Sequence, residues 1–367
     1  MILTLFIILA LSTLSYGLFT LFIIAGLLKR PRSERSERTP DVAVIMAARN
    51  EADKLEKILE DLVNQDYAGN LNIYVADDRS TDKTGKIIDR FSRQHTHFHA
   101  VKILKTSEHM TPKKHALTEC IKQTTAELVL TTDADCRVGS QWVSSAVSQF
   151  TDDVGVLVGY SQVAPTSFFA KYQTMDFAAI QVANAGMMAH GFHWSGTGQN
   201  LAYRRSAFSA IGGYTAVADQ ITGDDIYLVR NIPSKVGLQA VMSDDPTHFA
   251  ETLPQETFGE FMNQRIRWSS DSRGTHRNNP LFFTFLLSAF LSNAMILTLA
   301  VLGAWGPAFF TPLAIKFLVE GLVLILGARK FNFASVLWLY PFWFVLQPPY
   351  ITYVGLKGLR GKFTWKP

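Results

Sequence analysis

Long stretches without a charged side chain occupy both ends of this chain. Residues 1–28 contain no charge, and neither do residues 281–315 and 331–356. A helix needs about 20 mainly apolar residues to cross the hydrocarbon core of a bilayer, and each stretch is at least that long. The pattern predicts a membrane protein, with residues 1–28 as an N-terminal transmembrane helix.

A basic linker, residues 29–40, follows the first apolar stretch. It begins with Lys29, Arg30 and Arg32. A secretory signal peptide carries its positive charge before the apolar segment, so this segment is expected to be an anchor. Positive charge flanks membrane helices on the cytoplasmic side. We therefore expect a multi-pass protein of the cell's inner (plasma) membrane, whose next domain is cytosolic.

The C-terminal membrane region, residues 281–356, is predicted to contain two or three helices. Gly306 and Pro307 separate candidate spans at 281–303 and 308–328, and 331–356 is a proline-rich third candidate. Three full spans would place the basic tail, 357–367, outside the cell, against the charge rule. The last segment is therefore the candidate for a re-entrant or interfacial helix. Within the second span, Lys316 and Glu320 either serve a function or satisfy each other.

Residues 41–275 are predicted to form an α/β domain. Short apolar, β-branched runs alternate with segments of helical periodicity, which is typical of a mostly parallel, Rossmann-like sheet. The expected strands are 41–46, 72–76, 98–104, 127–132 and 154–160, and the expected helices are 51–66, 82–91, 113–124 and 142–150. Residues 166–190 suit either a helix lying on the membrane or a buried core helix.

The charge balance and the cysteines narrow the class of protein. A net charge of +4 is too small to indicate nucleic-acid binding, so no nucleic-acid partner is expected. The two cysteines, Cys120 and Cys136, lack CxxC spacing and are expected to be reduced thiols.

Acidic side chains follow two of the predicted strands. Asp77 and Asp78 end the second strand, and Asp133 and Asp135 end the fourth. Ligands of open α/β sheets bind beyond the carboxyl ends of the strands. Two carboxylates spaced i, i+2 suit Mg²⁺ or Mn²⁺, although a turn that caps the next helix has the same pattern. Asp77 and Asp78 could hold a nucleotide base, a ribose or a metal, or cap a helix.

Two later motifs combine charge with a fixed spacing. Asp224 and Asp225 follow a glycine and precede a predicted helix, where one carboxylate could act as a general base. The segment Gln264-Arg265-Ile266-Arg267-Trp268 lies before the first C-terminal span. Its arginines suit a diphosphate. Its tryptophan suits either a sugar face or the membrane interface.

Taken in order, these motifs resemble one family. The chain is similar to the family 2 glycosyltransferases of GT-A fold, the cellulose-synthase, hyaluronan-synthase and ceramide-glucosyltransferase-like membrane enzymes. The resemblance covers about residues 41–275. It rests on Ala47-Ala48-Arg49-Asn50-Glu51, Asp77-Asp78-Arg79-Ser80, Lys113-Lys114-His115-Ala116-Leu117, Asp133-Ala134-Asp135, Gly198 to Arg205, Gly212-Gly213, Gly223-Asp224-Asp225 and Gln264 to Trp268.

The resemblance implies a metal-dependent, inverting transfer from a UDP-sugar, with Mg²⁺ or Mn²⁺ as cofactor. It implies that Asp135, with Asp133 beside it, binds the metal, and that Asp225 is the general base, with Asp224 as the alternative. Gln264 and Trp268 would contact the acceptor. The nucleotide-sugar site would comprise Arg49, Glu51, Asp77, Asp78, Lys114, Asp133, Arg265 and Arg267.

Three functions fit these observations. The small membrane region favours a single transfer to a membrane lipid or a lipid-linked acceptor. The first alternative is a processive polysaccharide synthase that extrudes a β-linked polymer. The second is a non-catalytic membrane scaffold that binds nucleotides. The sequence does not determine the sugar or the acceptor.

Overall fold

The computed structural model describes residues 2–30, 32–220, 223–270 and 279–360. They form two compact units. We call the first the membrane unit; it comprises Met1–Lys29, Pro165–His190 and Pro254–Pro367. The second, the α/β unit, comprises Arg30–Ala164 and Gly191–Leu253. Each is described by itself.

A seven-stranded sheet of order β3-β2-β1-β4-β8-β6-β9 forms the centre of the α/β unit. Its pairs are parallel except where β8 runs antiparallel to β4 and β6. The predicted α/β fold with a mostly parallel sheet is confirmed. The strands are β1 (Val42–Ala48), β2 (Leu71–Asp78), β3 (Phe98–Ile103), β4 (Leu128–Thr132), β6 (Val154–Val158), β8 (Asn200–Arg204) and β9 (Gln239–Met242).

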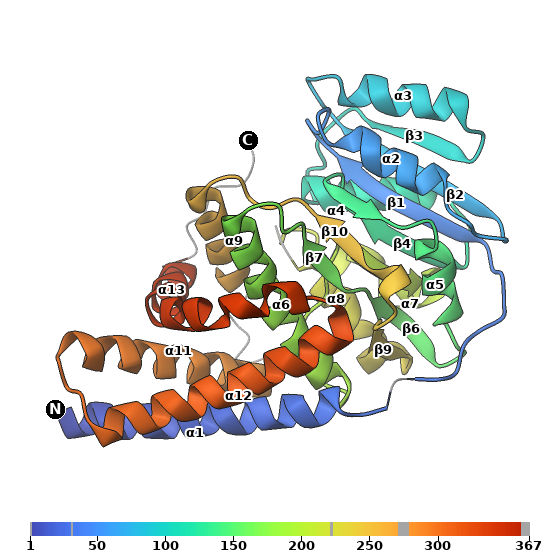
Figure 1. The fold of residues 1–367 in the computed structure, drawn as a ribbon. Helices are drawn as coiled ribbons and strands as arrows, with labels where there is room; N and C mark the ends of the chain where they lie inside the picture. The colour runs from blue at the N-terminus through green and yellow to red at the C-terminus, as the bar shows by residue number, and fades with distance from the viewer. Residues whose placement is uncertain (1, 31, 221–222, 271–278, 361–367) are drawn as a thin grey trace. The chain divides into compact units, whose positions relative to one another are not determined.

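Helices cover both faces of this sheet (Figure 1). Buried residues of α2 (Leu55–Val63), α3 (Thr84–Gln94) and α5 (Trp142–Ser148) share one core cluster with alternate residues of β1. Alternate residues of a strand point to opposite faces, and α4 (Pro112–Lys122) packs against β1 and β2 with buried residues outside that cluster. These helices confirm the four predicted from helical periodicity.

Shorter elements complete the α/β unit. A three-stranded sheet has the order β5-β10-β7, with β5 (Cys136–Val138), β7 (Ser161–Val163) and β10 (Ala250–Thr252). The other helices are α7 (Arg205–Ala210), η1 (Gly213–Val217), α8 (Asp224–Asn231), η2 (Ile232–Val236) and η3 (Pro246–His248). Cys120 and Cys136 are both buried free thiols, as expected.

Two arginines of the predicted linker lie against the α/β unit. Arg32 donates to Asp153 at 2.8 Å, and Arg38 donates to Glu127 at 2.9 Å. Both pairs are exposed to solvent, where an ion pair contributes at most about 1 kcal/mol. The linker is therefore held along the unit by several weak contacts.

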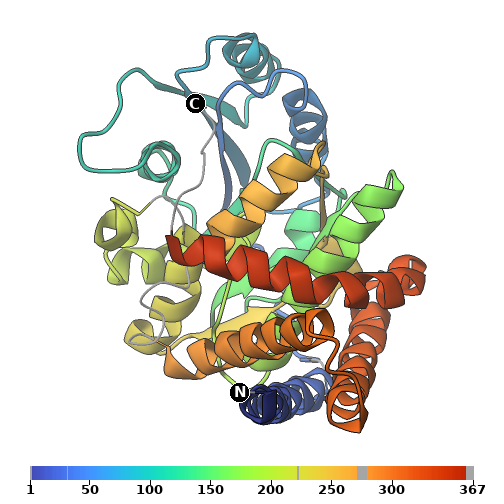
Figure 2. The same ribbon diagram turned by 90° about the vertical axis from the view of Figure 1, so that its left-hand side faces the viewer.

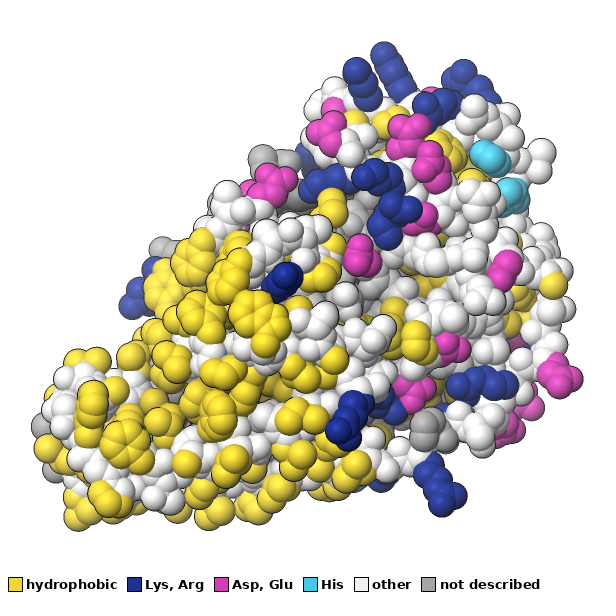
Figure 3. Space-filling view, in the orientation of Figure 1, with side chains coloured by type: hydrophobic (Ala, Val, Ile, Leu, Met, Phe, Trp, Pro, Cys, Tyr) yellow, Lys and Arg dark blue, Asp and Glu magenta, His cyan; other side chains and the backbone are white. Residues whose placement is uncertain are grey.

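In the membrane unit, α1 (Ile2–Leu27) packs beside both α11 (Pro280–Val301) and α12 (Pro307–Phe331). Of the described helices, these three are long and apolar enough to cross a bilayer. Hydrophobic side chains dominate the surface of the region that these helices form (Figure 3). The N-terminal span and the first two C-terminal candidates therefore correspond to helices of suitable length and composition.

The rest of the membrane unit consists of α6 (Phe168–Met188), α9 (Phe258–Ser270), η4 (Ala334–Leu339) and α13 (Tyr340–Arg360). Most of the third candidate span, 331–356, lies in η4 and α13, neither of which is long and apolar enough to cross a bilayer. Most side chains of α6 are buried, which favours the core-helix alternative. The predicted domain end at 275 and tail residues 361–367 lie outside the described residues.

Lys316 and Glu320 form a buried ion pair within α12. The Lys316 Nζ lies 2.6 Å from Glu320 Oε1, which also accepts a hydrogen bond from Tyr16 on α1 at 2.8 Å. The two charges therefore satisfy each other, as one of the two sequence-based alternatives predicted. The contact with Tyr16 links α12 to α1.

Candidate active site

Three parallel strand ends form one edge of the large sheet. β1 lies between β2 and β4, with Ala48 in register with Asp77. On the other side of β4, Thr132 pairs with Asn200 at the start of the antiparallel β8. The loops after β1, β2 and β4 and the loop before β8 therefore meet at this edge. The acidic strand ends lie where the sequence placed them.

Asp77 and Asp78 have different surroundings although they are adjacent. Asp77 accepts a hydrogen bond from the Ser80 backbone N–H at 3.0 Å and lies against the start of α3. A Cβ atom at Gly85 would be only 2.4 Å from Asp77 Oδ2, so a larger residue there would displace the Asp77 carboxylate. Asp78 is buried and pairs with the Arg79 guanidinium at 2.8 Å. Of the two carboxylates, Asp77 is the more exposed.

The loops after β1 and β2 are held together by hydrogen bonds. Asn50 adopts a left-handed φ of 53°, and its side chain accepts from the Thr81 N–H at 2.9 Å. The Glu51 N–H donates to Thr84 Oγ1 at 2.8 Å. These bonds place the backbone of Arg49 and Glu51 beside the loop that carries Asp77. Three residues of the predicted nucleotide site are thereby brought together.

A lysine lies among the carboxylates at the end of β4. The Lys113 Nζ lies 2.7 Å from Asp133 Oδ1, and both side chains are about one-third exposed, at 35% and 32%. Burial alone would lower the pKa of Lys113. The negative charges of Asp133, Asp224 and Asp225 outweigh that effect, so its pKa is raised. One ammonium group therefore faces three carboxylates.

The start of α8 carries two of these carboxylates to the same place. Gly223 has a φ of 83°, a left-handed conformation that suits glycine, and the helix begins at Asp224. A Cβ atom at Gly198 would lie 3.5 Å from Asp224 Oδ2 and 3.8 Å from Lys113 Nζ. The loop before β8 therefore lies directly against the acidic groups.

Asn200 fixes the loop that approaches these carboxylates. Its side chain is fully buried; it accepts from the Trp142 indole at 3.0 Å and donates to the carbonyls of Tyr160 and His248 at 3.0 and 2.8 Å. These bonds anchor the first residue of β8 and hence the end of the loop 196–199. Asn200 belongs to the motif Gly198 to Arg205, but the sequence pattern alone assigned it no role.

Lys113 was also missed, and Lys114 was chosen instead. Lys114 is 1% exposed and its ammonium group donates to the Gln220 backbone carbonyl. The doublet Lys113-Lys114 was a visible signal, but only the direction of each side chain from α4 distinguishes its members. The structure brings Lys113, rather than Lys114, into contact with Asp133.

The residues after β4 offer oxygen ligands for a divalent cation. Asp133 and Asp135 are both partly exposed. Asp133 already forms an ion pair with the Lys113 ammonium group, so the surroundings of this carboxylate tolerate a positive charge. Within the described residues, no group of three His, Cys, Asp or Glu side chains is arranged around one point. Two carboxylates suit a metal that takes its remaining oxygen ligands from a diphosphate.

The four predicted site residues of α9 lie in the membrane unit. The Arg265 guanidinium is 4% exposed and lies 2.7 Å from the Asp176 carboxylate. Positions two apart are rotated by about 200° around an α-helix. The helix therefore directs Arg265 and Arg267 to nearly opposite sides and does not bring them onto one face. Gln264 and Trp268 are both partly buried.

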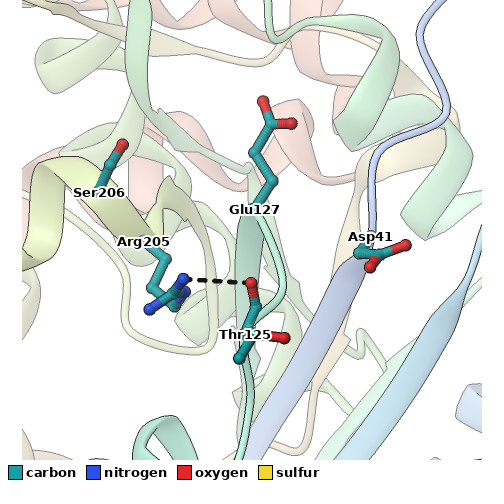
Figure 4. Close-up of a pocket in the computed structure, with 5 residues that line it drawn as sticks. All are labelled: Asp41, Thr125, Glu127, Arg205 and Ser206. Carbon is teal, nitrogen blue, oxygen red and sulfur yellow. Dashed lines mark hydrogen bonds between the residues drawn. The ribbon is translucent and has the colours of Figure 1, made fainter.

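A pocket lies at the opposite edge of the large sheet. It is lined by Asp41, Thr125, Glu127, Arg205 and Ser206 (Figure 4). These residues precede β1 and β4 or follow β8, so they mark the amino ends of the parallel strands. Ligands of such sheets bind at the carboxyl ends. This pocket is therefore not the candidate active site.

The chain is similar to known glycosyltransferases in sequence and in fold. The sequence profile described as glycosyl transferase family 21 matches residues 5–365. A mannosyltransferase from Pyrobaculum calidifontis, solved with GDP-Man and Mn²⁺, is 19% identical, with a TM-score of 0.62. The match covers 99% of this chain and 100% of that chain. At this identity the likeness establishes a GT-A-like fold alone.

Curated relatives match part of the chain. A β-monoglucosyldiacylglycerol synthase from Synechocystis sp. is 26% identical over 63% of this chain and 47% of its own length. An N-acetylglucosaminyltransferase from Rhizobium leguminosarum bv. viciae is 27% identical over 66% of this chain and 57% of its own length. The chain spans about half the length of the curated relatives it matches.

Proposed function

The chain belongs to glycosyl transferase family 21, and we propose that it transfers one sugar from a UDP-sugar to a membrane lipid or lipid-linked acceptor. The observation that carries this proposal is the group of Asp133, Asp224 and Asp225 around Lys113 at the carboxyl ends of the strands. With Asp135 two residues after Asp133, this partly exposed cluster would supply ligands for a divalent cation and a general base. The glucolipid synthase relative supports a lipid acceptor.

In this mechanism Asp225 accepts the proton of the acceptor hydroxyl. The hydroxyl oxygen forms a bond to the anomeric carbon as the bond from that carbon to the diphosphate breaks, and the configuration inverts. An aspartate is already ionised at neutral pH, because its reference pKa is about 3.9. Asp225 therefore acts mainly by its position. Asp224, at the same helix start, is the alternative base.

The nucleotide side of the reaction uses the strand-end loops. Asp77, with Arg49 and Glu51 beside it, is proposed to contact the uridine, because backbone N–H groups of these loops donate to side chains of the facing segment and join the loops to one another. Lys113 would approach the diphosphate. The family resemblance of the motif Gln264 to Trp268 supports a diphosphate-binding role for Arg267 as well.

Asp133 and Asp135 are proposed to hold Mg²⁺ or Mn²⁺. When bound, the ion would neutralise charge that develops on the leaving diphosphate. We also propose that the enzyme is a multi-pass protein of the inner membrane with its α/β unit in the cytosol. The three apolar helices and the basic residues after α1 support this proposal.

A donor screen tests the proposal. The full-length protein in detergent with Mn²⁺ and a membrane lipid extract should release UDP from one UDP-sugar and form a glycolipid of low mass. Asp225→Asn should lower the rate by about 10²–10⁴-fold, because it removes the base. Asp152→Asn, at an exposed turn, is the matched control and should leave the rate unchanged.

Other products would favour the alternatives. A long β-linked polymer would identify a processive polysaccharide synthase. Tight nucleotide binding without transfer from any donor would identify a non-catalytic scaffold. Either result would overturn the proposed single transfer.

A further inference from the structure

A closed group of polar side chains joins three helices of the membrane unit. Asp176 on α6 accepts a hydrogen bond from Arg265 Nε on α9 at 2.7 Å, and from the Tyr350 hydroxyl on α13 at 3.2 Å. Asp176 and Arg265 are about 5% exposed or less. Figure 2 shows α13 lying across α6 and α9. We call Asp176, Arg265 and Tyr350 the clamp.

Within the clamp, the planar guanidinium of Arg265 lies against the ring of Trp268. The Arg265 guanidinium carbon lies 4.2 Å from the centre of the Trp268 ring and 4.6 Å from that of Phe261. The Phe177 ring, one residue after Asp176, lies 5.4 Å from the Trp268 ring. The indole therefore has both Arg265 and Phe177 as neighbours. Stacking of this kind is an attractive contact that depends on the orientation of the planar guanidinium.

A second polar contact joins α6 to the segment just before α9. Gln173, three residues before Asp176 and hence on the same side of α6, donates to the Gln255 carbonyl at 2.9 Å and accepts from the Gln255 N–H at 2.8 Å. The two contacts together join α6 to α9 and to the segment just before it. A rotation of α9 would turn Trp268 away from its present direction.

We propose that Asp176 and Tyr350 are positioning residues that hold Arg265 as the platform for Trp268, so that Arg265 serves the acceptor side of the reaction and does not bind the diphosphate. This inference rests on the proposed function for the role of Trp268. It separates two arginines that share one motif. A guanidinium already engaged by a carboxylate and two aromatic rings has little capacity left for a phosphate, whereas Arg267 is directed to the other side of α9.

The test compares the acceptor and donor sides in the full-length enzyme. Asp176→Asn and Arg265→Lys should each raise the acceptor KM or lower kcat by about tenfold, because the platform for Trp268 loses its fixed orientation. The affinity for UDP should change by less than about threefold. Arg267→Lys is the matched variant on the same helix and should weaken UDP binding by about tenfold.

A set of milder variants keeps the test informative if Asp176→Asn does not fold. Tyr350→Phe removes one hydrogen bond from Asp176 and should produce a smaller effect in the same direction. Asp176→Glu should restore part of the acceptor kinetics. In the double variant Asp176→Asn with Trp268→Phe, the losses should not multiply, because both changes disturb one contact.

The inference would be overturned if Arg265→Lys weakened UDP binding as much as Arg267→Lys does. It would also be overturned if the clamp variants left the acceptor kinetics unchanged, or if their effects multiplied with that of Trp268→Phe. A wild-type protein that binds UDP but transfers no sugar contradicts the proposed function alone. The comparison of UDP affinity between the two arginine variants still decides whether Arg265 binds the diphosphate.

Discussion

The α/β unit and the membrane unit each contain a cluster of charged side chains, and the two clusters differ in balance and exposure. Around Lys113, one ammonium group faces three carboxylates, and the pair with Asp133 is about one-third exposed. Around Arg265, one guanidinium faces one carboxylate, and both are nearly inaccessible to water. An unbalanced, open cluster can take up a further cation. A balanced, closed cluster instead holds side chains and helices in place.

The largest contrast should appear in activity. Asp133→Asn in the open cluster should lower sugar transfer by about 10³-fold, since it removes one of the two proposed metal ligands, and the Mn²⁺ concentration needed for half-maximal rate should rise. Transfer rates over a Mn²⁺ titration measure both effects. Glu60→Gln, on the exposed side of α2, serves as the control. A variant with wild-type activity and Mn²⁺ dependence would remove the open cluster from the mechanism.

For stability, a substitution in the cluster around Arg265 should have the larger effect, and one in the cluster around Lys113 the smaller effect. Asp176→Leu leaves the Arg265 charge buried without its partner, and such a change typically costs about 3–5 kcal/mol. Lys113→Ala, in the partly exposed pair, should cost no more than about 1 kcal/mol. Denaturant unfolding of the full-length protein in detergent, followed by near-UV circular dichroism, measures both. Equal losses would show that the two clusters do not differ in the way their burial suggests.

A smaller effect concerns His248, a buried group in which burial outweighs the opposing charge of Asp245. Burial lowers the pKa of His248 to about 4, and neither ring nitrogen has a hydrogen-bond partner among the described residues. The unfolded chain binds a proton near pH 6.5 and the folded chain only near pH 4, so stability falls as the pH falls through this window. The difference should amount to about 2 kcal/mol at pH 5 relative to pH 8.

His248→Phe should flatten this part of the stability profile, because the titrating group is gone. Unfolding free energies measured between pH 8 and pH 5 check the result. A variant whose profile stays as steep as that of the wild type would assign the pH dependence to other groups. It would also weaken the distinction between closed and open charged groups.

Much of the fold could be predicted from the pattern of apolar residues along the sequence. Runs such as Val42–Ala48 and Leu128–Thr132 are apolar throughout because parallel strands are buried on both faces, and this pattern identifies them without a structure. The same holds for α1, α11 and α12, whose apolar length is set by the thickness of a bilayer. The antiparallel β8 in the middle of the sheet was not predicted, because strand direction depends on long-range pairing.

The sequence by itself determined the chemical inventory of this protein. It placed Asp77 and Asp133 at strand ends, and parallel pairing then brings those ends to one edge. The sequence could not determine which of two nearby residues of the same type makes a given contact. Whether Lys113 or Lys114 meets Asp133, and whether Arg265 or Arg267 pairs with Asp176, depends on the direction of each side chain from its helix. That direction is set by contacts with residues far away in the chain, such as Asp176 for Arg265, and only the tertiary structure contains them.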